Sequence, residues 1–451
     1  MKPREPEANG QHDMFRSRLD QILDMGHEKV ILADKIDWQF LSHRMGDVYT
    51  DGPGQPPLPN RLMAGLHILK YADNLSDDEV CARWLENPYY QYFCGEAFFC
   101  HALPLDRSSM TRWRQRMGEE RLQALLQESL SVAVATGAAK PVDFTRAVID
   151  TTVAEKDVAF PTDAKLIHRA RERLVRQAKG AGIDLRQSYV RFGKRTLIAH
   201  QRYAHAKQFK RANRQLRKLK TYLGRTIRDI RRKTKGDAAL EEAFLRPLWL
   251  GERVMTQKKR DPYPKVYALH APEVECIGKG KAHKPYEFGV KVSIATTLNR
   301  CKGGQFAIHA KALPGRPYDG HTLEALIPEI EDLTGATLKR ILADAGYRGH
   351  NAPGVYKLRV FTAGQKRRVT PAIKRQMKRR SAVEPVIGHI KNDHRMDRNR
   401  LAHKQGDAIN PVLAAVGYNF RLILKWIRFL LALFGMLILE NYRTRSVQIL
   451  A

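Results

Sequence analysis

The chain has 451 residues, which is enough for two or three domains with separate hydrophobic cores. Hydrophobic residues make up 43% of it, and that share argues against an intrinsically disordered chain. The 79 Lys and Arg against 47 Asp and Glu give a net charge of +32, which attracts polyanions such as nucleic acid. A basic protein whose charged surface is merely solvated has the same composition, and composition alone leaves that alternative open.

Five cysteines are scattered along the chain, and the polar start MKPREPEANGQHD has no apolar segment of the kind that marks a secretory signal. Their odd number and irregular spacing favour buried thiols in a reducing cytoplasm. Cys94, Cys100 and His101 lie close together. Because no second ligand pair follows them, a structural zinc site is the weaker interpretation.

Residues 1–140 are expected to form a helical N-terminal DNA-binding domain. Phe15, Leu19 and Ile22 keep helical spacing, and Ser76 before three acids is typical of a helix N-cap. The stretch TDGPGQPPLP predicts a loop between helices. Residues 61–85 have the spacing of a helix-turn-helix, but the acids that open its second helix would face phosphate poorly.

The stretch RSSMTRWRQRMG is the better candidate for DNA contact in this region. Arginines surround Trp113 there, and arginine side chains bind phosphate well. The alternative is a basic helix with a solvated surface. The residues expected to bind DNA are Arg112, Arg114 and Arg116.

A mixed α/β core is expected from residues 141–164 and 251–405. Short β-branched or alternating runs predict five strands, in RAVIDTTV, YEFGVKVSIATT, GQFAIHAKAL, LKRILADAGY and LRVFTAG. A helix, HTLEALIPEIEDL, is expected between the third and fourth of these strands. Strands that alternate with helices are typical of an α/β fold.

The segment 165–250 is expected to be a basic helical insertion. Between Lys165 and Lys235 it holds 24 Lys and Arg against three acids. Apolar residues recur from Phe209 to Ile230 at spacings of three and four, which predicts an amphipathic helix with one apolar seam. So basic a face favours binding along a phosphate backbone, and the alternative is a helical hairpin with a solvated surface. The DNA-contact residues expected on it are Arg214, Arg217, Lys218 and Lys220.

Residues 406–451 are expected to form a C-terminal helical segment. Its uninterrupted apolar run from Phe429 to Leu439 is 11 residues long. A membrane-spanning helix needs roughly 20 such residues. A buried or oligomer-forming helix is therefore the preferred interpretation, and no membrane partner is expected.

Two aspartates stand at unusual places in so basic a protein. Asp150 lies inside the apolar run AVIDTTV, where an uncompensated charge would be costly. Asp344 ends the apolar strand ILAD just before a glycine, which places its carboxylate at an open sheet edge. Converging carboxylates are the oxygen ligands that Mg²⁺ prefers, although an aspartate at a strand end also commonly caps a turn.

Glu384 is a third candidate carboxylate. On one continuous helix, Arg380, Glu384 and Lys391 would face the same way. Pro385 indicates that the helix begins nearby. The spacing of Ser381 and Glu384 also matches a capping box, which would make the glutamate a device for starting the helix. Spacing alone does not choose between the two interpretations.

These motifs carry a resemblance to a known family. The phrases DTTVAEKDVAFPTDAKL, PGRPYDGHTLEALI, DAGYRG and SAVEPVIGHIKNDHRMDRN are similar to those of DDE transposases of bacterial insertion sequences, in particular the "insertion sequence five" family. Arg380, Glu384 and Lys391 follow the family's R-x3-E-x6-K spacing, and the resemblance covers most of the chain. Met377 stands where the related signature has a tyrosine, so the role of that tyrosine is in doubt here.

The resemblance implies an RNase H-like core with Asp150 on its first strand, Asp344 after its fourth and Glu384 on a following helix. These three carboxylates would be the catalytic ligands of Mg²⁺, with Mn²⁺ as a substitute. The DNA contacts near the site would come from Arg380, Lys391, Tyr347 and Arg348.

The implied activity is metal-dependent cleavage at terminal inverted repeats, followed by transfer of the 3′-OH end into target DNA. The implied partner is double-stranded DNA, bound by a homodimer in the bacterial cytoplasm and associated with the nucleoid. Two rivals remain, a nuclease of similar fold that does not join DNA and an inactive DNA-binding descendant of a transposase. Inverted repeats in the DNA beside the gene would favour the mobile element.

Overall fold

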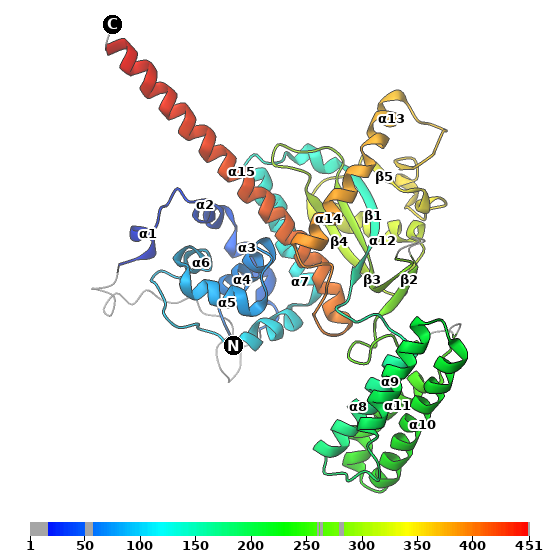
Figure 1. Ribbon diagram of the computed structural model, residues 1–451. Coiled ribbons are helices and arrows are strands. Elements are labelled where there is room, and N and C mark those ends of the chain that lie inside the picture. The colour runs from blue at the N-terminus through cyan, green and yellow to red at the C-terminus, as the bar shows by residue number, and fades with distance from the viewer. Residues whose placement is uncertain (1–16, 50–56, 259–260, 262–264, 279–283, 450–451) are drawn as a thin grey trace. The chain divides into compact units, whose positions relative to one another are not determined.

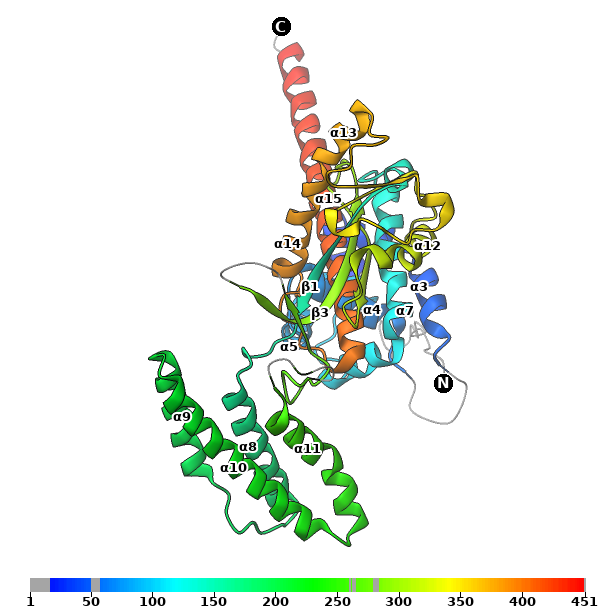
Figure 2. The same ribbon diagram turned by 90° about the vertical axis from the view of Figure 1, so that its right-hand side faces the viewer.

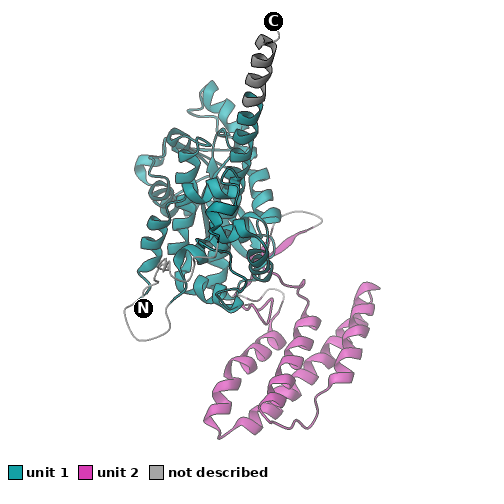
Figure 3. Cartoon of the chain, turned by 90° about the vertical axis from the view of Figure 1, so that its left-hand side faces the viewer, with its two compact units in different colours: residues 1–155, 290–451 teal, residues 156–289 magenta. Residues whose placement is uncertain are grey.

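The structure is a computed structural model that describes residues 17–49, 57–258, 261, 265–278 and 284–449, with side chains up to residue 437 (Figure 1). It divides into two compact units, one of residues 1–155 with 290–451 and the other of residues 156–289 (Figure 3). Each unit has its own hydrophobic core. The expected basic insertion, 165–250, falls within the second unit.

Helices make up the described N-terminal part of unit 1, as predicted. They are α1 (Leu19–Ile22), α2 (Glu28–Lys35), α3 (Trp38–Gly46), α4 (Asn60–Ala72), α5 (Asp77–Glu86), α6 (Pro88–Phe93) and α7 (Arg107–Ala135). The predicted N-cap is confirmed. The Ser76 side chain accepts from the Glu79 amide, and the Glu79 side chain accepts from the Ser76 amide. The first helix is only four residues long, and Phe15 and loop residues 50–56 lie outside the described residues.

A mixed sheet forms the centre of the fold, and all five predicted strands are confirmed. It consists of β1 (Arg146–Glu155), β2 (Glu275–Gly278), β3 (Tyr286–Thr297), β4 (Ala307–Leu313), β5 (Arg340–Ala343) and β6 (Val360–Thr362). The order is β2-β3-β1-β5-β6, with β4 paired to β3. Strands β1, β5 and β6 run parallel, whereas β2, β3 and β4 pair antiparallel. The sequence did not reveal β2, a half-exposed strand of four residues.

Helices pack on both sides of this sheet in unit 1. The bounds are α12 (Leu323–Thr334), α13 (Pro371–Lys378), α14 (Val383–Asp393) and α15 (His403–Ile449), with the short 3₁₀ turns η1 (Pro141–Thr145), η2 (Asp319–Thr322), η3 (Ala345–Tyr347), η4 (Gly354–Tyr356) and η5 (Arg380–Ala382). Helix α14 packs against β1, and α7, α12 and α15 contact β4. In Figure 2, α14 and α12 lie on opposite sides of the sheet. The predicted helix HTLEALIPEIEDL is confirmed as α12 and the turn before it.

The first half of α15 belongs to the core of unit 1, whereas the apolar run from Phe429, on which the prediction of a buried or oligomer-forming helix was based, is exposed as far as its side chains are described. Its Asn419 is fully buried and bonds both the amide and the carbonyl of Ala307 on β4. A Cβ at Gly417 would lie 2.4 Å from the backbone of Tyr71, so only glycine allows α15 this close to α4. Beyond Ile427 the described side chains are largely exposed, Phe434 among them at 64%. No described helix has an apolar stretch long enough for a membrane crossing.

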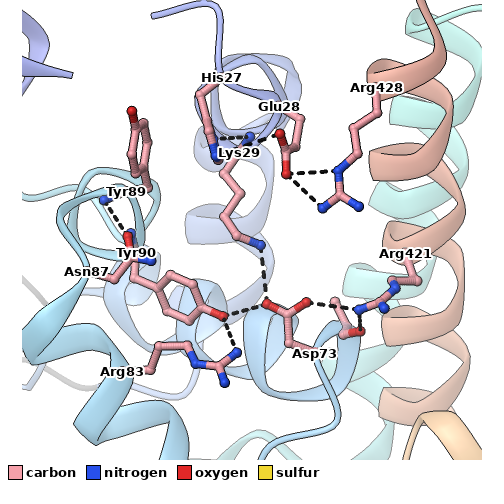
Figure 4. A network of polar contacts seen from close by, with 11 residues as sticks. His27, Glu28, Lys29, Asp73, Arg83, Asn87, Tyr89, Tyr90, Arg421 and Arg428 are labelled. Atoms are coloured by element: carbon pink, nitrogen blue, oxygen red, sulfur yellow. Dashed lines mark hydrogen bonds and ion pairs between the residues drawn. The ribbon is translucent and has the colours of Figure 1, made fainter. Parts of the chain in front are cut away.

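Charged side chains also fasten α15 to the N-terminal helices (Figure 4). Asp73, just after α4, accepts from Lys29 Nζ at 3.2 Å, Tyr90 Oη at 2.5 Å and Arg421 Nη1 at 3.1 Å. A second bridge joins Arg428 to Glu28. The N-terminal helices, the sheet and α15 therefore share one hydrophobic core, closed at its edge by ion pairs.

Unit 2 contains four helices within its described residues, α8 (Asp163–Gly180), α9 (Val190–His205), α10 (Phe209–Thr234) and α11 (Ala238–Thr256). The predicted apolar seam of α10 packs inside this bundle through Leu219, Leu223, Ile227 and Ile230. Phe209 was also placed in the seam, but its position at the first residue of the helix leaves it 64% exposed. Only the opposite, charged face of α10 remains for solvent or a ligand.

Candidate active site

Asp150 and Asp344 come together because of the register of two parallel strands. The last registered pair of β1 and β5 is Ile149 with Ala343. Each aspartate follows that pair on its own strand, so the two carboxylates are neighbours across the sheet. They are 194 positions apart in the chain, and only the crossover to β5 brings them side by side.

The neighbourhood disfavours charge on Asp150. Burial above all, together with the nearby carboxylates of Asp344 and Asp319, raises its pKa to about 6. The Thr151 amide, which donates to Asp150 Oδ1 at 2.8 Å, and the Arg380 guanidinium act in the opposite direction. A cation that approaches both aspartates would therefore stabilise the ionised form of the Asp150 carboxyl.

Arg380 supplies a cation at this place in the structure. It lies in η5, directly before α14, and its Nη1 is 3.7 Å from Asp344 Oδ1. The Arg380 side chain is 21% exposed and the Asp344 side chain 50% exposed, so the pair sits at the rim and not in the core. The family resemblance implied a position for Arg380 near the active site, and in the structure Arg380 lies beside Asp344, one of the candidate carboxylates.

Asp319 is a further acid near Asp150 and Asp344, and its sequence context predicted no role for it. It opens η2, where its Oδ1 accepts from Thr151 Oγ1 at 2.8 Å and from Lys291 Nζ at 2.5 Å. Thr151 is the residue directly after Asp150, so Asp319 holds the strand at the candidate site. Its one signal in the sequence was an acid in a turn before a helix, and such acids are common.

Glu384 stands in the first turn of α14 and is exposed. The capping-box interpretation of this residue is wrong, because the N-cap is Ala382 and no side chain caps the helix. Ser381 instead donates to the carbonyl of Lys378. The helix begins at Val383, as Pro385 predicted, so Arg380 belongs to the preceding 3₁₀ turn and not to one continuous helix.

Lys391 lies near the other end of α14. Its Nζ is 3.9 Å from Glu155 Oε1 at the end of β1. Both β1 and α14 therefore carry residues of the candidate site. Arg380 at the start of this segment and Lys391 near its end each face a carboxylate on the sheet.

The remaining candidate DNA contacts differ in their exposure. Arg348 is exposed, and its Nη2 donates to the carbonyl of Ala363. Tyr347 is 1% exposed, and burial beside Asp319 raises the pKa of its hydroxyl well above the ordinary value. Tyr347 is therefore a core residue, and the expectation that its side chain contacts DNA must be corrected.

The arginines of α7 also divide into two groups. Arg112 and Arg116 are exposed. Arg114 is 3% exposed, and its two terminal nitrogens donate to Asp77 at 2.8 and 2.7 Å. The expected DNA-contact face must be corrected at Arg114, because its guanidinium already pairs with a carboxylate in the core. The four cations named on α10 lie away from its seam, with Lys220 half-buried and the other three exposed.

The donor set fits a divalent cation in part. Two adjacent carboxylates, one of them with a raised pKa, are a suitable start for an oxygen-ligated ion. Within the described residues, however, no three His, Cys, Asp or Glu side chains lie close enough together to hold a metal. Asp150 and Asp344 can therefore hold one as a pair, whereas Glu384 lies outside that cluster.

Comparisons with known proteins match two parts of the chain. Residues 17–116 match a transposase domain (DUF772), and residues 269–420 match the transposase DDE domain. The second range includes Asp344, Glu384 and Asp319, whereas Asp150 lies outside both. A 209-residue protein from Rhizobium meliloti, "Uncharacterized protein ORF8 in nfe locus", is 47% identical over 46% of this chain and 100% of its own length.

The two matched domains and the neighbouring aspartates define a transposase, and the DDE domain implies an RNase H-like fold. The chain belongs to the same family as the Rhizobium meliloti protein. No solved structure matches it. The match does not extend to the particular insertion-sequence family that the motifs resemble.

Proposed function

We propose that this transposase is active, belongs to the "insertion sequence five" type, and uses Asp150, Asp344 and Glu384 to cut and join DNA. The observation that carries the proposal is the register that sets Asp150, in the middle of β1, beside Asp344, which directly follows the end of β5. Two neighbouring carboxylates, one of which has a raised pKa, have a clear physical use as a cation site. Residues 1–140 would read the terminal repeats.

The reaction consists of two phosphoryl transfers in one site. Water attacks phosphorus at the transposon end, the bond to the 3′ oxygen breaks, and that oxygen leaves as a 3′-OH. The 3′-OH then attacks a phosphorus of target DNA, so one phosphodiester bond forms as another breaks. A bound Mg²⁺ or Mn²⁺ would stabilise charge on the attacking and leaving oxygens.

The protein groups would position DNA for these transfers. Arg380 and Lys391 would hold phosphates on either side of Glu384, which lies between them on the chain. Glu384 is exposed in the first turn of α14, where its side chain has room to turn towards the two aspartates. Positioning of this kind accounts for a large share of catalysis in phosphoryl transfer.

The basic face of unit 2 would grip DNA without reading its sequence. Arg214, Arg217 and Lys218 are exposed on α10, away from its packed seam. Replacement of these three and Lys220 by Gln should weaken binding to all duplexes alike and flatten its salt dependence. A loss confined to the cognate end would instead mean that the segment reads bases.

The direct test is cleavage of a labelled duplex that carries the DNA flanking the gene. Asp150→Asn, Asp344→Asn and Glu384→Gln should each abolish cleavage and keep DNA binding, and EDTA should stop the wild-type reaction. Asp332→Asn, at an exposed carboxylate on α12, is the matched control and should cleave as wild type does. Full cleavage by any one of the three variants would remove that residue from the site.

A further inference from the structure

A pocket of about 250 Å³ lies in unit 1, outside the candidate active site. Residues of α4, α5 and α7 line one side of it. The segment between α14 and α15, together with the start of α15, lines the other. It therefore opens where the residues of the two matched transposase domains meet.

The charges around this pocket are unbalanced. Asp77 is the one carboxylate among its lining residues. The cations that line it are Lys70, Arg114, Arg395, Arg398 and Arg400. The lining thus holds five cations and one carboxylate, so an anion that enters the pocket meets mainly cationic side chains.

The floor of the pocket is a buried cluster. Lys70, at 4% exposure, donates to Asp77 Oδ1 at 2.7 Å, and Arg114 forks onto the same carboxylate. Burial above all, together with the Arg114 charge, lowers the pKa of Lys70 to about 8. One carboxylate thus serves two buried cations, so the floor keeps an attraction for a second anion.

The rim is held in place by a buried asparagine. Asn399 is 1% exposed, and its amide donates to the carbonyl of Glu155 at the end of β1. Its side chain also bonds Asp407 and the amide of Leu401. The neighbours of Asn399 in the chain, Arg398 and Arg400, are exposed. The hydrogen bonds of Asn399 therefore hold the backbone of Arg398 and Arg400 in place at the edge of the pocket.

Arg395 adds a strained position to the same segment. Its φ of 68° is in the left-handed region, which a side chain larger than glycine disfavours. Its Nη1 donates to the carbonyl of Asn74, and this bond ties the segment to the end of α4. Such strain persists where the surroundings determine it, and it often marks a ligand site.

We infer that this pocket binds one phosphate of the DNA backbone, with Arg398 and Arg400 as its gripping residues and the Lys70–Asp77–Arg114 cluster as its floor. The volume is below the roughly 300–1,000 Å³ of pockets that enclose whole drug-sized ligands, so it suits a small anionic group. Guanidinium groups match phosphate oxygens in charge and geometry. This inference rests on the proposed function, since DNA is the polyanion that a transposase must hold.

The location gives the bound phosphate a use. The Asn399 bond connects the rim to β1, the strand of Asp150, and the rim segment directly follows α14. DNA held here would be registered against the same strand and helix that carry the candidate catalytic residues. Phosphate contacts position a duplex in this way without reading its sequence.

The test measures DNA binding over a series of NaCl concentrations by fluorescence anisotropy, with the full chain and a duplex from beside the gene. The variant Arg398→Gln/Arg400→Gln should bind at least several-fold more weakly, with the slope of log affinity against log salt smaller by about 1. The control is Arg146→Gln/Lys339→Gln, which removes the same charge from two exposed residues. Arg146 is the first residue of β1, and Lys339 directly precedes β5. It should keep the wild-type slope.

Phosphate-ethylation interference then locates the contact. Wild type should show interference at a backbone position that the Arg398→Gln/Arg400→Gln variant no longer shows. A variant slope equal to the control slope would overturn the inference, provided that the wild type binds and cleaves DNA. A wild-type chain that binds no DNA at any salt concentration would instead contradict the proposed function itself.

Inorganic phosphate separates the two sources of the anion. If phosphate raises the melting temperature of wild type but not of the variant, and the variant keeps the wild-type DNA slope, the pocket takes free phosphate and the assignment to DNA is wrong. If phosphate competes with DNA for wild type and not for the variant, both bind in the same pocket and the inference holds.

Discussion

The Nη1 atom of Arg380 lies 3.7 Å from Oδ1 of Asp344, so a protein cation already stands beside the candidate catalytic carboxylates. Its charge also lowers the pKa of Asp150, which burial and the neighbouring acids raise. Arg380 therefore reaches both aspartates from the turn that precedes α14. A residue in this position influences the carboxylates as well as any DNA that it binds.

Arg380→Ala should raise the pKa of Asp150, because the variant loses a cation near two carboxylates. The acidic limb of the cleavage rate against pH should then move to higher pH, by up to about one unit. Cleavage should be measured at saturating DNA, so that weaker binding does not contribute. An unchanged limb together with weaker DNA binding would show that Arg380 acts on DNA alone.

Asp319→Ala should slow cleavage by as much as about 10²-fold while DNA binding and melting temperature change little, since small displacements within a site have effects of this size. The variant leaves Thr151 Oγ1 and Lys291 Nζ without their shared acceptor, and Thr151 adjoins Asp150. Asp319→Asn keeps an oxygen at that place and should recover part of the rate. Equal rates for Asp319→Ala and wild type would exclude a positioning role.

Asp73 should be important for stability, because it partners a largely buried lysine. Lys29 is 9% exposed, and Asp73→Ala would leave its charge without that partner (Figure 4). We expect a loss of about 3–5 kcal/mol in the free energy of unfolding, measured by urea denaturation. The exposed bridge is the comparison: Arg428→Gln should cost no more than about 1 kcal/mol. Similar small losses for both variants would mean that the Asp73 network does not stabilise the fold.

Glu128 should make stability depend on pH. Burial raises the pKa of its carboxyl from 4.5 to about 7 in the folded chain. Between these values the folded state keeps a proton that the unfolded state has lost, so stability falls as pH rises from 4.5 to 7 and is constant above. The total loss is roughly 3 kcal/mol.

The variant Glu128→Gln should lack that part of the pH dependence, because its amide does not titrate. Urea denaturation at pH 5 and pH 8 measures the difference for both proteins. If wild type and variant lose the same free energy between the two pH values, other groups cause the change and the carboxyl of Glu128 is not perturbed.

The sequence predicted those parts of the fold that depend on local pattern. RAVIDTTV is a strand because its β-branched residues suit a buried sheet, and Leu219, Leu223 and Ile227 share a helix face because of their spacing. Patterns of this kind are properties of neighbouring residues, and tertiary contacts do not have to be known.

Residues whose roles depend on distant partners could not be assigned in this way. Arg114 looks like a surface arginine in the sequence, but Asp77 from another helix pairs with it in the core. Nothing in the sequence distinguishes Asp319 from other acids that precede a helix, yet its partners Thr151 and Lys291 lie on two different strands. The pairing of Asp150 with Asp344 likewise required the register of β1 and β5, which spacing does not determine.

Asp150 and Asp344 are expected to belong to a site that joins DNA as well as cutting it. The most direct measurement is the transfer of a pre-cleaved transposon end into a supercoiled plasmid in the presence of Mg²⁺, with ends that carry either a 3′-OH or a 3′-deoxy terminus. Wild type should join only the 3′-OH end, and the variants Asp150→Asn and Asp344→Asn, which still bind the end, should join neither. Joining by either variant at the wild-type rate, or cutting by wild type without any joining of the 3′-OH end, would exclude this role for the two aspartates.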